Sequence, residues 1–418
     1  MNDVRSASII GQKLMEGPVI TVDVSKGNCH YQPFIENGHP MRKPKVLDDT
    51  IDGFSRISRL IEDLEKKTGA KELPVVFEAT GVYHRPLQKY LQDNGIPYYI
   101  ISPLLSATYR KTTLNGNKTD SLDCTHIAKA YYSEKLCPYY EQSPEYLRLM
   151  RLNRYYEGEL VYLRKRKVAL RSYLDIIYPR IDKKFSGNQN IYDPLPMEVF
   201  KQYPHPSLLL KHREDVIVKR ICKPSGHKPG YAEKIVHKIY EAAKECYSGC
   251  GPYDIEVIEL PEMIKKMQEQ EQLCQSILSD ITALAKAVPY YACLTSIPGI
   301  GDNLASRIIS ELGDIDRFHN RSALVAYAGL NPKILQSGDI DGIHLKISKK
   351  GNKHLRCLLY LAASCNYRAK KYDPVYEFSK KKRQQFGSHK SKAATVATAH
   401  KLLVVIYAMC KNGSLYSF

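Results

Sequence analysis

Residues 18–34 read PVITVDVSKGNCHYQPF and contain two extended runs, one at residues 19–24 and one near residues 30–34. Both runs are short and rich in β-branched or aromatic side chains, the composition that favours strands. Asp23 stands at the end of the first run. This stretch predicts two strands, with a carboxylate placed at the end of the first.

The segment that follows alternates in the same way. Apolar residues at helical spacing cover residues 51–67, and a buried-strand run at 73–77 delivers Glu78 at its end. A second helix is expected at 83–93 and a further strand at 97–102. This alternation predicts an α/β domain, which we bound at residues 1–140.

Four acidic residues stand where this scaffold can bring them together: Asp23, Glu78, Asp120 and Asp123. The last two are three residues apart at the start of a helix expected to run to about residue 132, so they share one face. Converging carboxylates repel by several kcal/mol (about 4 per close pair) unless cations compensate. The pattern favours Mg²⁺, or Mn²⁺, and phosphoryl-transfer chemistry. Taken singly, each acid could instead cap a turn or a helix.

Basic residues accompany these acids. The chain of 418 residues has 62 Lys and Arg against 44 Asp and Glu, a net charge of +18 that points to a polyanionic partner. Lys118 closes a basic stretch just before Asp120. No apolar run approaches the length of a membrane span, and no signal-peptide core is evident, so we expect a cytoplasmic protein without a membrane partner.

Two heptad repeats follow, at residues 141–182 and 255–290, and predict coiled-coil assembly helices. The apolar positions of the repeats are Leu149, Tyr156, Leu163, Leu170 and Ile177, and then Leu260, Met267, Cys274, Ile281 and Val288. Polar Asn153 and Lys167 occupy core positions of the first repeat, where they can fix register.

Residues 183–254 lack sustained periodicity and are interpreted as an inserted subdomain or excursion. Cys222, His227, Cys246 and Cys250 form the chain's closest approach to a zinc motif. Their spacing lacks paired CxxC elements, so reduced thiols are expected instead.

The remaining chain, residues 291–418, predicts a mainly α-helical domain. LTSIPGIGDNLASRIISELGD resembles a helix-hairpin-helix in which Gly299 and Gly301 let the backbone approach phosphates. An alternative is a plain helical corner.

Further along, Ser337 lies in a polar loop, where it could be exposed to a ligand or be an ordinary turn residue. Four cations surround the next helix start and form either a phosphate cradle or a solvated basic face: Lys349, Lys350, Lys353 and Arg356.

The ordered motifs ITVDVSK, VVFEATGVY, NKTDSLDC, SIPGIG, AYAGLNP, QSGD and SKKGNKHLR resemble the DEDD transposases of the insertion-sequence 110 and 1111 group. The resemblance implies a RuvC-like domain of ribonuclease-H fold, with Mg²⁺ held by Asp23, Glu78, Asp120 and Asp123. It also implies a C-terminal transposase domain with a nucleophilic serine. That serine falls on Ser337, with Ser348 of the SKKG motif ranked second.

In that family an element-encoded structured RNA, the bridge RNA, pairs with donor and target DNA, and the protein acts as a homo-oligomer. The resemblance therefore implies DNA, guide RNA and further copies of the chain, in a tetramer, as partners. Serine would form a covalent link to DNA. Two alternatives stay open, namely a RuvC-like junction endonuclease that uses water, and a non-catalytic basic nucleic-acid-binding scaffold.

Overall fold

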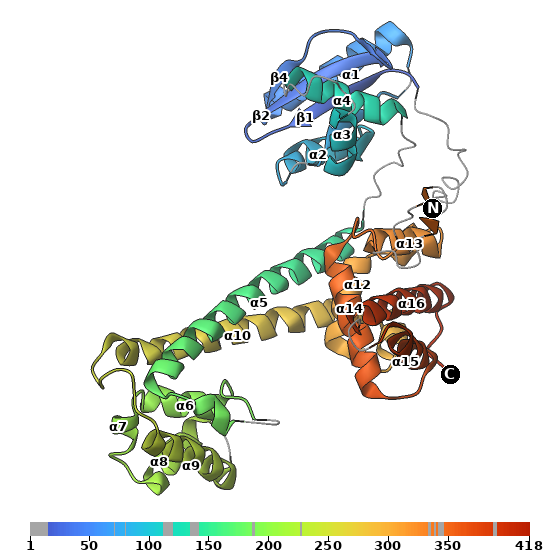
Figure 1. Ribbon diagram of the computed structural model, residues 1–418. Helices are drawn as coiled ribbons and strands as arrows, with labels where there is room; N and C mark the ends of the chain where they lie inside the picture. The colour runs from blue at the N-terminus through green and yellow to red at the C-terminus, as the bar shows by residue number, and fades with distance from the viewer. Residues whose placement is uncertain are drawn as a thin grey trace. The chain divides into compact units, whose positions relative to one another are not determined.

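The computed structural model describes residues 16–70, 72–79, 81–111, 120–133, 142–185, 189–225, 228–332, 336–337, 340–341, 347–387 and 391–418 (Figure 1). The chain divides into two compact units, Met1–Glu141 and Gln142–Phe418. The first is a mixed α/β unit. The second is almost entirely helical.

The first unit is built on one mixed sheet with the strand order β3-β2-β1-β5-β6, and β4 also pairs with β2. β1 runs antiparallel to β2 and parallel to β5, and β5 runs parallel to β6. The strands are β1 Val19–Val24, β2 Asn28–Glu36, β3 His39–Pro40, β4 Lys45–Asp48, β5 Val75–Glu78 and β6 Tyr98–Ile101.

Helices cover both faces of this sheet (Figure 1). They are α1 Ile51–Thr68, α2 His84–Asp93, α3 Pro103–Lys111 and α4 Asp120–Ser133. Alternate residues of β1 serve the two faces, because successive strand side chains point in opposite directions. Ile20 and Val22 pack with α1 and α2, whereas Val19 packs with α4 and with Val76 of β5.

The strand predicted at residues 19–24 is confirmed with the same bounds, whereas other predicted bounds shift. The strand expected at 73–77 is Val75–Glu78, because its ladder with β1 begins opposite Ile20. Glu78 is therefore the last residue of the strand. The strand near residues 30–34 is longer, Asn28–Glu36, and two short strands, β3 and β4, extend the sheet beyond it.

The second unit is organised around two long helices that pack against each other, α5 Pro144–Ile177 and α10 Ile255–Lys286. In Figure 1 they are the green and yellow helices lying side by side. The heptad residues Leu149, Tyr156 and Leu163 of α5 are buried, as are Leu260 and Met267 of α10. The apolar repeats thus form the contact between the two helices.

Small helices join the far ends of this pair. They are η2 Ile181–Lys184, α6 Pro194–Gln202, α7 Pro206–Leu209, α8 Glu214–Ser225 and α9 Pro229–Glu245. They occupy the segment interpreted from sequence as an insertion, and their apolar residues join the core of the second unit.

The C-terminal helices form a bundle against the other end of α5 and α10 (Figure 1). Its elements are α11 Tyr291–Thr295, α12 Asp302–Leu312, η3 Ile315–Arg317, α13 Arg321–Ala328, α14 Lys353–Ala369, α15 Pro374–Phe386 and α16 Ser391–Asn412, with a two-stranded ribbon of β7 Gln336–Ser337 and β8 Ile340–Asp341.

Among the described residues, α16 is the one helix long and apolar enough to cross a membrane by length and composition. Leu402, Leu403 and Ile406 of this helix are fully buried. α16 packs against α14 and α15 in the bundle. Its apolar composition is therefore explained by its place in a protein core.

Candidate functional site

Two of the four predicted acids lie on neighbouring strands at the same level of the sheet. β1 and β5 pair in parallel with Val22 opposite Phe77, so the next residues along each strand are Asp23 and Glu78. Both lie an even number of residues from Val19 and Val76, which face α4. Their side chains therefore face α4. Asp23 is half-buried and Glu78 is buried.

Helix α4 brings a third acid to this face. The Cys124 thiol of α4 donates to the carbonyl oxygen of His30 at 3.3 Å, and His30 is the residue paired with Asp23 across β1 and β2. Asp123, the preceding residue, is 7% exposed, with its Oδ1 3.8 Å from Nδ1 of His126. The fourth acid, Asp120, is the first residue of α4.

The pKa of Cys124 also indicates that Asp23 and Asp123 lie near the same buried group. The pKa of the thiol is raised to about 12, chiefly by burial, and the nearby carboxylates of Asp23 and Asp123 contribute to this increase. Both charges therefore act on one buried group. A thiol held neutral in this way neither binds a metal nor acts as a nucleophile.

The donor set of this face is made of carboxylate oxygens, the ligands that hard divalent cations such as Mg²⁺ and Mn²⁺ prefer. Burying Glu78 and Asp123 close to Asp23 carries a repulsive cost that a divalent cation would offset. The residues present therefore fit a divalent metal ion, and Asp23, Glu78 and Asp123 would hold it, with Asp120 on the same helix.

A separate group of metal-type ligands lies in the second unit, where Glu214, His237 and Glu241 come together on α8 and α9. His237 Nδ1 lies 3.0 Å from Glu214 Oε2, and Lys244 Nζ donates to Glu241 Oε1 at 2.8 Å. His237 is exposed and Glu241 is already paired with Lys244, so the cluster is explained as a surface network of hydrogen bonds and ion pairs.

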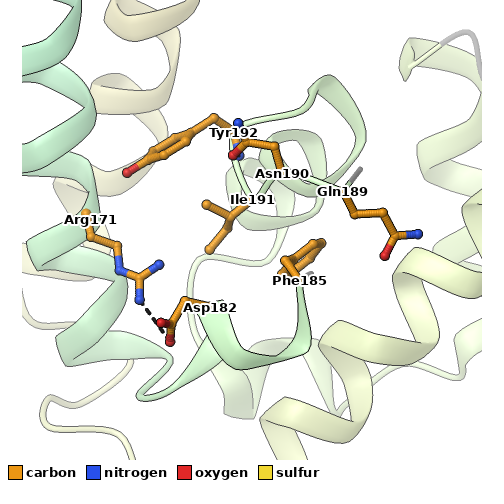
Figure 2. Close-up of a pocket in the computed structure, with 7 residues that line it drawn as sticks. All are labelled: Arg171, Asp182, Phe185, Gln189, Asn190, Ile191 and Tyr192. Carbon is orange, nitrogen blue, oxygen red and sulfur yellow. Dashed lines mark hydrogen bonds and ion pairs between the residues drawn. The ribbon is translucent and has the colours of Figure 1, made fainter. Parts of the chain in front are cut away.

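The inserted helices also contain a cavity of about 480 Å³ beside α5 (Figure 2). Arg171, the one cation among the described residues that line it, bonds to Asp182 at 2.9 Å and to Asp175 at 2.9 Å. Phe185 and Tyr192 supply aromatic walls. Because two carboxylates neutralise the guanidinium, the cavity does not favour an anion such as phosphate.

The predicted cysteine group of this region is only partly described. Cys222, Cys246 and Cys250 are free thiols, and His227 lies outside the described residues. Burial raises the pKa of both Cys246 and Cys250.

The sequence predicted that Gly299 and Gly301 both let the backbone approach phosphates. In the structure, the two glycines of this turn before α12 have different surroundings. Gly299 has φ +85°, and a Cβ there would lie 2.5 Å from the backbone nitrogen of Asn366 in α14. Gly299 therefore allows the turn to pack closely on α14. Gly301 caps α12 and has open space around it. The helix before the turn, α11, has only five residues.

The two candidate serines lie on either side of the segment 338–346. Ser337 ends β7, paired with Ile340 of β8, rather than lying in an irregular loop. The Ser348 hydroxyl donates to Asn331 Oδ1 at 2.7 Å. Lys118 lies outside the described residues, whereas Lys349, Lys350, Lys353 and Arg356 gather at the start of α14.

Sequence reasoning missed a buried polar network that joins α5 to the bundle. Asn153 is fully buried, donates to Glu311 Oε1 at 2.9 Å and accepts from Arg307 Nε at 3.0 Å. Arg307 also pairs with Glu157 at 3.1 Å, and Asn352 donates to Glu311 Oε2 at 2.8 Å. The signal available in the sequence was Asn153, a polar residue at a heptad core position.

Two family profiles match the chain. The profile of the transposase IS116/IS110/IS902 family matches residues 291–377. A transposase profile of the IS110 DEDD type matches residues 20–179, which include all four acids. The chain belongs to this transposase family. The two matching profiles together cover most of the α/β unit, helix α5 and much of the C-terminal bundle.

Individual relatives carry consistent names. An insertion element IS110 protein of Streptomyces coelicolor is 28% identical over 52% of this chain and 52% of its own length. The transposase of element IS1111A of Coxiella burnetii is 33% identical over 33% of this chain and 37% of its own. The chain thus spans about half, or less, of these two relatives. An IS116 protein of Streptomyces clavuligerus is 23% identical over 95% of this chain and 96% of its own length.

Proposed function

We propose that the protein is a DNA transposase that cuts and rejoins donor and target DNA. The observation that carries this proposal is the convergence of Asp23, Glu78 and Asp123 on one face of the sheet, inside a region that matches a DEDD transposase profile. Relatives support DNA as the substrate, because two Moraxella relatives are named pilin gene-inverting proteins, each 32% identical over 28% of this chain.

The fold of the first unit supports a RuvC-like, ribonuclease-H assignment. Its sheet has antiparallel strands on one side of β1 and parallel strands on the other, with helices on both faces. Acids at the ends of its central strands, and on a helix over one face, suit a site for phosphodiester chemistry. When bound, Mg²⁺ would neutralise charge at the reacting phosphate.

Ser337 is the proposed nucleophile. Its Oγ would form a bond to phosphorus while the bond from phosphorus to one sugar oxygen breaks, and that oxygen leaves with a proton as a hydroxyl. A hydroxyl of the other DNA strand then attacks the phosphoserine ester, which restores the serine and joins the strands. The role of the acids would be to hold the divalent metal ion that neutralises charge at the scissile phosphate, and Ser348 is the second candidate for the nucleophile.

Guide RNA and further copies of the chain are the proposed partners. The net charge of +18 suits more than one nucleic-acid strand. Outside its contact with α10, helix α5 also exposes apolar side chains seven residues apart, Tyr155 with Tyr162 and Val161 with Val168. A second stripe of this spacing supports assembly of copies through α5 into a homo-oligomer, for which we propose a tetramer.

A recombination assay with matched variants tests this function. The chain is supplied with donor and target DNA and with the RNA that co-purifies from cells carrying the element. We expect joined product from the unaltered chain, and none from Asp123→Asn or Ser337→Ala. Lys381→Gln, at an exposed lysine of α15, is the folded, charge-altered control.

The pattern of loss separates the alternatives. Cleavage without joining by Ser337→Ala would indicate a junction endonuclease that uses water. Unchanged joining by Asp123→Asn, and by the unaltered chain after metal removal, would indicate that the acids are structural and would contradict the proposal.

A further inference from the structure

We propose that the turn 348–352 and the first turn of α14 form a clamp for one phosphate group of a nucleic-acid backbone. The clamp adds a binding site to the proposed function. It rests on that function only for the conclusion that the bound polyanion is a nucleic acid. A cavity of about 280 Å³ lies here, with Lys349, Lys353 and Arg356 in its wall. Leu330 and Val396 are among the apolar residues that complete it.

The described lining of the cavity has a net positive charge. No Asp or Glu is among its described lining residues. In the described part of the chain, no ion pair joins Lys349, Lys353 or Arg356 to a carboxylate, and Arg356 Nη1 donates to the carbonyl of Ala328 at 2.9 Å. Three cations around one cavity repel one another, and an anion bound among them would relieve that repulsion.

The three cations in the wall of this cavity of about 280 Å³ favour an anionic group over a neutral ligand. Cations that hold a backbone phosphate contribute affinity without reading sequence. The clamp therefore suits either DNA or RNA, whose phosphodiester groups are chemically alike.

The backbone of the turn is held in an unusual conformation. Lys349 has φ +55° and Gly351 has φ +143°. A Cβ at Gly351 would lie 2.4 Å from the carbonyl oxygen of Tyr327. The Ser348 backbone N–H donates to Asn331 O at 2.8 Å, and that of Lys349 donates to Gly329 O at 3.2 Å. Strained backbone persists where its surroundings fix it, and such strain concentrates at functional sites.

Asn352 fixes the other end of the turn. Its backbone N–H donates to Tyr327 O at 2.6 Å, and its Oδ1 accepts from the backbone N–H groups of His354 and Leu355 at 2.9 and 3.0 Å. Its Nδ2 donates to Glu311 Oε2 at 2.8 Å. Glu311 is 1% exposed and also bonds to Asn153 of α5. Asn352 and Glu311 are thus positioning residues for the clamp.

Fluorescence anisotropy of the full chain with a labelled DNA duplex, and separately with a labelled single-stranded RNA, tests the clamp. We expect the double variant Lys349→Gln/Lys353→Gln to bind about 5- to 10-fold more weakly near 0.1 M salt. The slope of log affinity against log salt should fall by about 0.9 for duplex or about 0.7 for a single strand.

Lys381→Gln is the matched control, because Lys381 is an exposed lysine of α15 that neither belongs to the turn 348–352 nor lines the cavity. Loss confined to the double variant, on DNA, RNA or both, supports the clamp and identifies the strand that it holds. Equal loss per charge in Lys381→Gln would overturn the clamp, because a diffuse basic face would explain both results. Unchanged affinity for both probes would also overturn it.

A donor–acceptor exchange tests the positioning residues. Asn352→Asp keeps the helix cap but places a carboxylate against Glu311, so we expect weaker binding and a lower salt slope. Adding Glu311→Gln supplies an amide donor to Asp at 352 and should recover both. A lower melting temperature with unchanged affinity and slope in Asn352→Asp would show a structural role only.

These binding results are independent of recombination. Normal binding with no strand joining would count against the proposed function alone. Normal joining with an unchanged salt slope in the double variant would count against the clamp alone.

Discussion

Replacing Asn153 by leucine should destabilise the second unit, although the residue occupies a heptad core position. In an ordinary coiled coil, a buried Asn costs stability and an apolar residue recovers it. Here Asn153 is fully buried between charged partners, donating to Glu311 and accepting from Arg307. Leucine would leave both groups one hydrogen bond short in a site that excludes water.

The magnitude follows from the two bonds lost. Hydrogen bonds to charged groups contribute about 1.5 kcal/mol or more each, so the loss is about 3 kcal/mol. The added apolar burial of leucine returns about 1 kcal/mol. Glu311 keeps its hydrogen bond to Asn352, and Arg307 keeps its hydrogen bond to Glu157. The free energy lost per hydrogen bond should therefore lie at the lower end of the range for bonds to charged groups. We expect a net destabilisation of about 2 kcal/mol.

Native-state hydrogen exchange read by mass spectrometry measures this change locally. Peptides from α5 and α12 should lose about 2 kcal/mol of protection, while peptides from α1 in the other unit stay unchanged as an internal reference. Lys167→Leu is the matched control, because Lys167 occupies the other polar core position but is 26% exposed and pairs with Glu271, itself 37% exposed. Its effect should stay within about 1 kcal/mol. Equal or higher protection in Asn153→Leu would refute the reasoning.

Three further predictions concern other parts of the molecule. Cys124, whose pKa is raised to about 12, should resist alkylation at pH 8, because the reactive thiolate forms only as the pH rises toward that pKa. The exposed Cys357 should be alkylated under the same conditions, and peptide mapping measures the labelling of both residues. Gly351→Ala should lower stability by about 2 kcal/mol or more, seen as faster exchange in α13 and α14, because its Cβ would clash with Tyr327 O. Removing divalent metal with a chelator should stop strand joining without weakening nucleic-acid binding, and joining should return when Mg²⁺ or Mn²⁺ is restored.

Much of the α/β unit could be predicted from local sequence, because each of its central strands is a short run bounded by polar or turn residues. Val19–Val24 has the predicted bounds. Short edge strands such as Lys45–Asp48 were missed, since most of their residues are exposed and leave no apolar pattern. Their pairing with β2 is decided by the sheet and not by their own composition.

The candidate site was likewise predicted in part from local sequence, while the rest depends on long-range packing. Residue spacing placed Asp23 and Glu78 at strand ends, and the parallel register of β1 and β5 brings them together. The bond from Asn153 to Glu311 joins residues 158 positions apart, so no local pattern could identify it. The heptad repeat marked Asn153 as unusual, but only the packing of α12 on α5 supplies its partners.

Mapping a covalent protein–DNA adduct tests the central claim most directly. The full chain is incubated with DNA and Mg²⁺, the product is denatured and digested, and the peptide that retains a nucleotide is sequenced by mass spectrometry. We predict a nucleotide on Ser337, lost in Asp123→Asn and without metal. Efficient strand joining with no serine adduct, or with the adduct unaffected by Asp123→Asn, would contradict the account.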